Sequence, residues 1–232
     1  MVGLDNGNEL KMYDKSFSPG ILWWLFLALF SPLVAVGAFH VVTEAIDSYQ
    51  SYLWFAVGIL LFIIFDRFII RGKDDTIRIF SHELNHAVVS LMLFKKVHSF
   101  HVEQSGGVVY HTSGGRLPTV LINLAPYCLP LFSYVFLIAR AAMKPTLLWI
   151  ADILIGITID FYISVFRQQT RSYQPDISQY RHRLFPYWYI FTFLLFNASI
   201  IIYSLLPGKN VFIAFADTFV GYWHCIVQLL KI

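Results

Sequence analysis

The sequence predicts an all-α polytopic membrane protein with about six transmembrane helices and a small β-hairpin near the middle of the chain. Of its 232 residues, 57% are hydrophobic and only 13% are charged, about half the charged fraction of an ordinary soluble domain. Several apolar stretches reach about 20 residues, the length that a helix needs to cross a bilayer. Between two of them lies a glycine-containing segment rich in β-branched and aromatic residues, which is typical of paired strands.

The N-terminal part predicts a polar tail followed by two transmembrane helices. Residues 1–20 are mostly polar, and the first apolar stretch after them has no small-residue cleavage site, so it is expected to be a retained anchor. The two helices are expected within 21–75. The linker between them, 43–50, has no Lys or Arg, whereas Arg67 and Arg71 end the second helix. Because basic residues favour the cytoplasmic side, this pattern predicts a cytoplasmic N-terminus.

The central residues, 76–206, predict a core made of one helix, a hairpin and three further apolar segments. The helix is expected at 76–94, which is apolar apart from one polar cluster. The hairpin is expected to turn near Gly106-Gly107. The next apolar segment, 117–138, contains three prolines, and proline inside a helix removes a backbone hydrogen bond and bends it. The last two apolar segments of this core are 146–166 and 185–206.

A C-terminal hydrophobic segment, 207–232, follows, although polar side chains interrupt it. Two basic clusters, at 67–78 and 167–183, both favour the cytoplasmic side of the membrane. Three apolar stretches lie between these clusters, and three complete crossings would place the clusters on opposite sides. We therefore expect that either the proline-containing segment 117–138 or the hairpin re-enters the membrane without crossing it.

The distribution of charge argues against a nucleic-acid-binding protein. The net charge is only +3, and the basic residues occur in short runs. Apolar segments of membrane length separate these runs, so they do not form the continuous basic face that nucleic-acid binding requires. The sequence thus predicts the lipid bilayer as a partner and excludes nucleic acid.

The polar cluster in 76–94 is the motif HELNH, from His82 to His86. Positions four residues apart share one face of a helix, so both imidazoles can reach one metal ion. Glu83 follows the first histidine and can take a proton from a water on that ion. Zinc lowers the pKa of such a water towards neutrality, which gives hydroxide for attack on a carbonyl. The alternative, a helix end whose polar residues face solvent, is disfavoured because ionisable groups inside an apolar run are costly and mark functional sites.

A catalytic zinc site needs three protein ligands, and the motif supplies only two. Three aspartates are candidates for the third. Asp152 and Asp160 lie eight residues apart in the apolar segment 146–166, so their depth in the membrane favours them, Asp160 above all. Asp176 lies in a loop, where it could also be a helix N-cap. Asp176 is favoured if its loop lies on the same side of the membrane as the start of the HELNH helix.

With the HELNH motif, the glycine hairpin and a later aspartate, the chain resembles the site-2 protease class of intramembrane zinc metalloproteases, in particular its bacterial M50-type branch. The resemblance covers roughly 76–206, and HELNH is its one strongly specific element. LAPYCLP at 124–130 is similar to the proline-bearing middle helix of that branch, and QPDISQY at 174–180 is similar to its aspartate motif. The NPxP…LDG signature of the better-known members is absent.

The resemblance implies a zinc ion held by His82, His86 and Asp176, with Glu83 as general base. The order of preference for the third ligand is then Asp176, Asp160 and Asp152. It also implies that strands after the metal-binding helix hold an unwound membrane-protein substrate in extended form. A bacterial inner membrane is the implied location, and regulation by a membrane partner or by prior trimming of the substrate is expected.

Asn123, inside the proline-containing segment, is a candidate donor to the oxyanion, and a hydrogen bond between helices is an equal alternative for it. Three other functions stay open at this point: a prenyl-protein-type peptidase, a scaffold with an inactive site, and a transporter that moves ions or protons. Only four glutamates occur in the chain, which argues against the first. The intact Glu83 argues against the second, and HELNH would be unexplained in the third.

Overall fold

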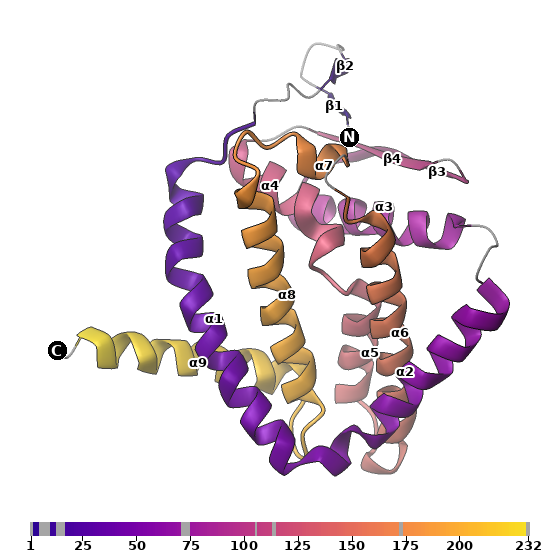
Figure 1. Cartoon of the computed structure of the whole chain (residues 1–232), viewed down its shortest axis with the longest axis vertical. Helices are drawn as coiled ribbons and strands as arrows, with labels where there is room; N and C mark the ends of the chain where they lie inside the picture. The colour runs from indigo at the N-terminus through magenta and orange to yellow at the C-terminus, as the bar shows by residue number, and fades with distance from the viewer. Residues whose placement is uncertain are drawn as a thin grey trace. The chain divides into compact units, whose positions relative to one another are not determined.

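The computed structural model describes residues 2–4, 10–12, 17–70, 75–104, 106–112, 115–171 and 174–230 (Figure 1). Arg71, expected at the end of the second span, lies outside these ranges. The elements are β1 (Val2–Leu4), β2 (Leu10–Met12), α1 (Ile21–Asp47), α2 (Leu53–Phe65), α3 (Thr76–Met92), β3 (Val97–Glu103), β4 (Gly106–Thr112), α4 (Arg116–Leu124), α5 (Leu131–Ala141), α6 (Leu148–Gln169), α7 (Pro175–Ser178), α8 (Leu184–Ser204) and α9 (Val211–Leu230). Short 3₁₀ turns (Tyr49–Tyr52, Ala125–Tyr127 and Pro145–Leu147) and a π-helical turn (Asp66–Ile70) connect or extend them.

Five helical segments in the described part of the chain are long and apolar enough to cross a membrane. They are Ile21–Asp47, Tyr49–Phe68, Pro145–Gln169, Leu184–Ser204 and Val211–Gln228. A sixth span results if the bent pair Arg116–Tyr127 and Leu131–Ala141 counts as one. The chain is therefore a helical, polytopic integral membrane protein, as the composition predicts.

The bent pair lies in the proline-containing segment, one of the two segments, with the hairpin, of which one was expected to re-enter the membrane. Its two helices meet at an angle of 84°. α4 ends at Leu124, a 3₁₀ turn with Pro126 follows, and Pro130 precedes the first residue of α5. Neither proline has a backbone N–H to donate, so the helix cannot continue through this stretch. Such a bend occurs both in broken spans and in re-entrant loops.

α3 is helical as predicted, but it is not one of the candidate spans. Its 17 residues fall short of the about 20 that cross the hydrocarbon region. Arg78, near its first turn, is buried and ties this end of the helix to the rest of the fold. The Arg78 guanidinium donates to Asp75 Oδ1 at 2.8 Å and to Ser164 Oγ of α6 at 3.0 Å. The bond to Ser164 ties the first turn of α3 to α6.

The predicted hairpin is present as the antiparallel pair β3–β4, in which Glu103 faces Gly106 at the turn. The sheet is larger than predicted, because β1 joins β4 in parallel and β2 pairs with β1, giving the order β2-β1-β4-β3. The first two strands lie in the segment that the sequence predicts to be only a polar tail. α3 packs against both β3 and β4 (Figure 1).

The chain divides into two compact units, and α1, α6 and α8 contribute residues to both. The first comprises Met1–Leu27, Gly72–Leu129 and Ile163–Phe191, and it contains α3, the sheet, α4 and α7. The second comprises Ala28–Arg71, Pro130–Tyr162 and Thr192–Ile232. In the second unit α2 and α6 touch backbone to backbone, because a side chain at Gly58 or Gly156 would overlap the other helix. Small residues allow this close approach between membrane helices.

Candidate metal centre

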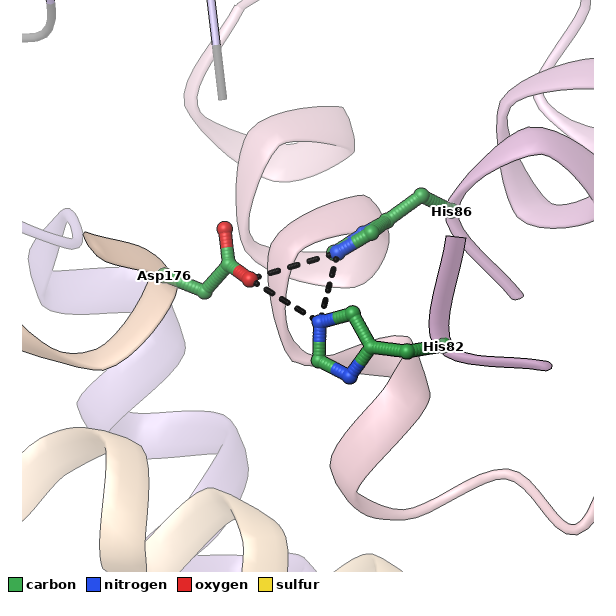
Figure 2. Close-up of side chains that lie close together, drawn as sticks. All are labelled: His82, His86 and Asp176. Atoms are coloured by element: carbon green, nitrogen blue, oxygen red, sulfur yellow. Dashed lines mark hydrogen bonds and ion pairs between the residues drawn. The ribbon is translucent and has the colours of Figure 1, made fainter. Parts of the chain in front are cut away.

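His82 and His86 lie on the buried face of α3, one helical turn apart. His82 is 6% exposed and His86 is 2% exposed, so neither faces solvent in the way that the alternative interpretation of HELNH required. Their rings lie at 76° to each other, and the two Nε2 atoms are 3.3 Å apart (Figure 2). The spacing of the motif thus brings both imidazole nitrogens to one point.

Asp176 comes to the same point from α7, a single turn located 94 residues after His82. Pro175 occupies the first turn of α7 and Gln174 is its N-cap, so Asp176 is inside the helix and is not the cap. The Gln179 amide donates to the Asp176 carbonyl at 3.1 Å. The backbone of Phe17 pairs with the residues on both sides of Tyr180, which ties down the segment after α7.

The three side chains form a triangle of ligand atoms, and Figure 2 shows its three sides. Asp176 Oδ2 lies 3.4 Å from His82 Nε2 and 3.2 Å from His86 Nε2. A metal ion with tetrahedral bonds of about 2.0–2.1 Å holds neighbouring ligand atoms about 3.3 Å apart. The observed separations match this value on all three sides. His82, His86 and Asp176 therefore form a buried group that can hold a metal ion.

The hydrogen bond on the far side of His86 shows which nitrogen faces the group. His86 Nδ1 lies 2.8 Å from the carbonyl oxygen of Ile122, and a carbonyl only accepts, so Nδ1 carries a proton. In the neutral ring, Nε2 then has a free lone pair. That lone pair points towards the Asp176 carboxylate and the His82 ring. Lone pairs repel one another, and a cation between them removes the repulsion.

The pKa values of the two carboxyl groups at the site are shifted in opposite directions. Burial alone would raise the pKa of the Asp176 carboxyl, but when the two imidazoles carry a proton on Nε2 and no metal is bound, their charge and hydrogen bonds overcome this effect and hold the pKa well below its ordinary value. Asp176 is therefore ionised and suited to a cation. Burial raises the pKa of the Glu83 carboxyl above its ordinary value, although the same imidazoles oppose the shift. A carboxyl with a raised pKa is a better proton acceptor at neutral pH.

Glu83 borders a cavity of about 250 Å³, which the three members of the group also line. Gly106–Val109 of β4 also line the cavity, as do Gln169 and Gln174, and the Gln174 amide donates to Gln169 at 3.2 Å. Gly107 lies directly against the Glu83 side chain, and a Cβ at this position would overlap it. The absence of a side chain at 107 thus gives the carboxylate its place beside the group.

The other candidates for a third ligand do not join this group. Asp152 forms an ion pair with Arg140 at 2.7 Å in the second unit, and both side chains are buried. Arg140 also donates to the carbonyl oxygens of Ser204 and Lys209. The Arg140–Asp152 pair therefore belongs to a separate hydrogen-bonded cluster, which does not include the metal-binding group. Asp160 lies on α6 and is not a member of the group either.

Asn123 is fully buried in α4, one residue after the carbonyl that binds His86. Neither polar atom of its side chain has a hydrogen-bond partner among the residues that the structure describes. The hydrogen bond between helices that was considered for Asn123 is therefore absent from that part of the chain. Asn123 does not line the cavity.

Three further histidines lie on the strands of the hairpin. His98 and His101 are both exposed on β3. His111 differs, because it is 2% exposed and lies on β4 with its Nδ1 next to the carbonyl of Thr112. None of the three belongs to the metal-binding group among the described residues.

Sequence reasoning did not single out Tyr127. It is completely buried, its hydroxyl donates to Asp176 Oδ2 at 3.3 Å, and its ring packs edge-on against His82 with centroids 5.2 Å apart. The one available signal was its position within LAPYCLP, directly after Pro126.

No protein-family model, curated protein or solved structure matches the chain in the comparisons with known proteins.

Proposed function

We propose that the protein is an intramembrane zinc metalloprotease of the site-2 protease class, which hydrolyses a peptide bond of a membrane-embedded substrate. The observation that carries this proposal is the convergence of two imidazole nitrogens and one carboxylate oxygen on a single point, beside a cavity that a further carboxylate lines. The apolar helices of the chain supply the membrane setting. The fit of the HELNH, hairpin and aspartate segments to the family pattern supports it further.

The donor set favours zinc over other metal ions. Two histidines and one carboxylate are the protein ligands of many catalytic zinc sites, in which a fourth position stays open. Calcium and magnesium prefer ligand shells made of oxygen alone. When bound, zinc would supply a Lewis acid that polarises the substrate carbonyl and lowers the pKa of water in the cavity.

Glu83 is the general base of the proposed reaction. It is the residue next to the first ligand on α3, it lines the cavity, and it is not a member of the metal-binding group. The proton of the attacking water passes to its carboxylate and then to the leaving amine. Asn123, whose two side-chain polar atoms are unpaired among the described residues, is the proposed donor to the oxyanion, a role that requires its side chain to turn towards the cavity, which it does not line in this structure.

The edge of β4 is the proposed place for the substrate. Residues 106–109 line the cavity and pair with β3 on one side only, while β1 pairs with β4 further along, at His111 and Thr112. Backbone groups on the other edge of 106–109 have no partner strand in the described ranges. An unwound segment of a membrane helix exposes backbone N–H and C=O groups of its own. If this segment added as a strand at this edge, the backbone groups of the substrate and of β4 would form hydrogen bonds with each other.

The test is a pair of measurements on the full chain in detergent. Metal content is determined after purification, and cleavage of a membrane-helix substrate is compared for the wild type and Glu83→Gln. We expect about one bound zinc per chain in both proteins. We expect turnover to fall by about 10²- to 10⁴-fold in the variant, since a general base contributes that much. Wild-type protein that binds no metal, or a Glu83→Gln variant with normal turnover, would refute the proposal.

The location in a bacterial inner membrane with a cytoplasmic N-terminus is part of the same proposal. The basic residues that flank the second apolar stretch favour this orientation. Labelling of single cysteines placed at Ser48 and Arg183 in intact cells tests it. We expect the loop at Ser48 to react with a membrane-impermeant reagent and the loop at Arg183 to be protected, and the reverse pattern would contradict the orientation.

A further inference from the structure

Tyr127 contacts two members of the metal-binding group at once. Its hydroxyl donates to Asp176 Oδ2, the same oxygen that faces His82 and His86. Its ring lies edge-on against the His82 ring at 80°. Tyr127 is completely buried, so its hydroxyl and its ring make these contacts and have none with solvent.

The shape of the chain around Tyr127 explains how it reaches this position. α4 brings the carbonyl of Ile122 to His86 Nδ1 at 2.8 Å. The 3₁₀ turn at Ala125–Tyr127 then changes the direction of the chain, because Pro126 cannot continue the helix. The short segment from Ile122 to Tyr127 thereby touches all three members of the group.

The hydroxyl is compatible with a metal ion on the same carboxylate oxygen. A carboxylate oxygen has two lone pairs. One can face the point where the imidazole nitrogens converge while the other accepts the phenol hydrogen bond. Without this bond the short Asp176 side chain could rotate and present either oxygen, or neither, to the ion. Partners that hold metal ligands in place commonly change metal affinity by 10- to 100-fold.

We propose that Tyr127 is a positioning residue that orients the Asp176 carboxylate for metal binding and thereby sets the affinity of the site. This inference rests on the proposed metal site, but not on proteolysis. Tyr127 acts through Asp176 and does not bind the metal ion itself. The fixed 3₁₀ turn between α4 and α5 is thus part of the metal centre.

The experiment measures zinc affinity of the metal-depleted full chain in detergent by competition with a chromophoric chelator. Tyr127→Phe keeps the ring against His82 and removes only the hydroxyl. Tyr134→Phe is the matched control, since the Tyr134 hydroxyl donates to Asn197 Oδ1 in the second unit and neither residue belongs to the metal-binding group. We expect Kd for zinc to rise by about 10- to 100-fold in Tyr127→Phe and by less than about threefold in the control.

A second readout separates positioning from a general loss of structure. Cobalt replaces zinc in such sites, and its visible absorption bands depend on how the carboxylate binds. We expect Tyr127→Phe to shift these bands while its thermal unfolding in the metal-free state stays within a few degrees of Tyr134→Phe, since each loses one hydroxyl bond. Equal zinc affinity and equal cobalt spectra for wild type and Tyr127→Phe would overturn the inference and leave the metal site intact. Wild-type protein without measurable zinc binding would instead refute the proposed function.

Discussion

The contact between Gly107 and Glu83 makes a quantitative prediction for Gly107→Ala. A Cβ at 107 would lie 3.0 Å from both Cδ and Oε1 of Glu83 and nearer still to its Cγ, whereas ordinary van der Waals contact begins at 3.4 Å. The backbone of β4 is held by its pairing with β3, in which Gly107 faces Val102. The Glu83 side chain therefore has to move, by about 1 Å. A displacement of that size in an active site can lower the rate by about 10²-fold.

The assay is the turnover of a membrane-helix substrate by Gly107→Ala, with the zinc content measured on the same sample. We expect turnover to fall by about 10²-fold while zinc stays bound, because Glu83 is not in the metal-binding group. The control is Gly221→Ala on α9, since a Cβ at Gly221 meets nothing within 4 Å. It should keep its activity. If Gly107→Ala cleaved the substrate at the wild-type rate, the position of Glu83 against β4 would not matter for catalysis.

The remaining predictions concern the ligands and the alternative aspartate. His82→Ala and His86→Ala should each lose bound zinc, measured by elemental analysis, and a variant that kept stoichiometric zinc would exclude that residue as a ligand. Asp152→Asn should keep its zinc but lose about 3–5 kcal/mol of stability, because it leaves the buried Arg140 without its charge partner. Loss of zinc from Asp152→Asn with unchanged unfolding in denaturant would reverse that assignment. Treatment with a strong chelator should abolish turnover, and added zinc should restore it, with recovery by buffer alone as the contradicting result.

Much of the architecture follows from local sequence. The apolar stretches became helices at nearly the predicted places, since length and hydropathy determine which segments can reside in a membrane. The hairpin formed where glycines and β-branched residues predicted it. α1 is longer than expected and runs through Asp47, so the polar residues after the apolar stretch do not end the helix. The two N-terminal strands were missed because strands of three residues carry no periodic signal of their own.

By itself the sequence determined the helical membrane fold and the pair His82 and His86, because the four-residue spacing of a motif on one helix is a local property that 3.6 residues per turn convert directly into geometry. Only the tertiary structure decided that Asp176, and neither Asp152 nor Asp160, completes the group. It also decided that Tyr127 supports Asp176 and that Gly107 makes room for Glu83. These contacts join residues far apart along the chain, and they depend on where a proline-bent segment and a single helical turn are held. No local pattern encodes such distances, since they result from packing of the whole unit.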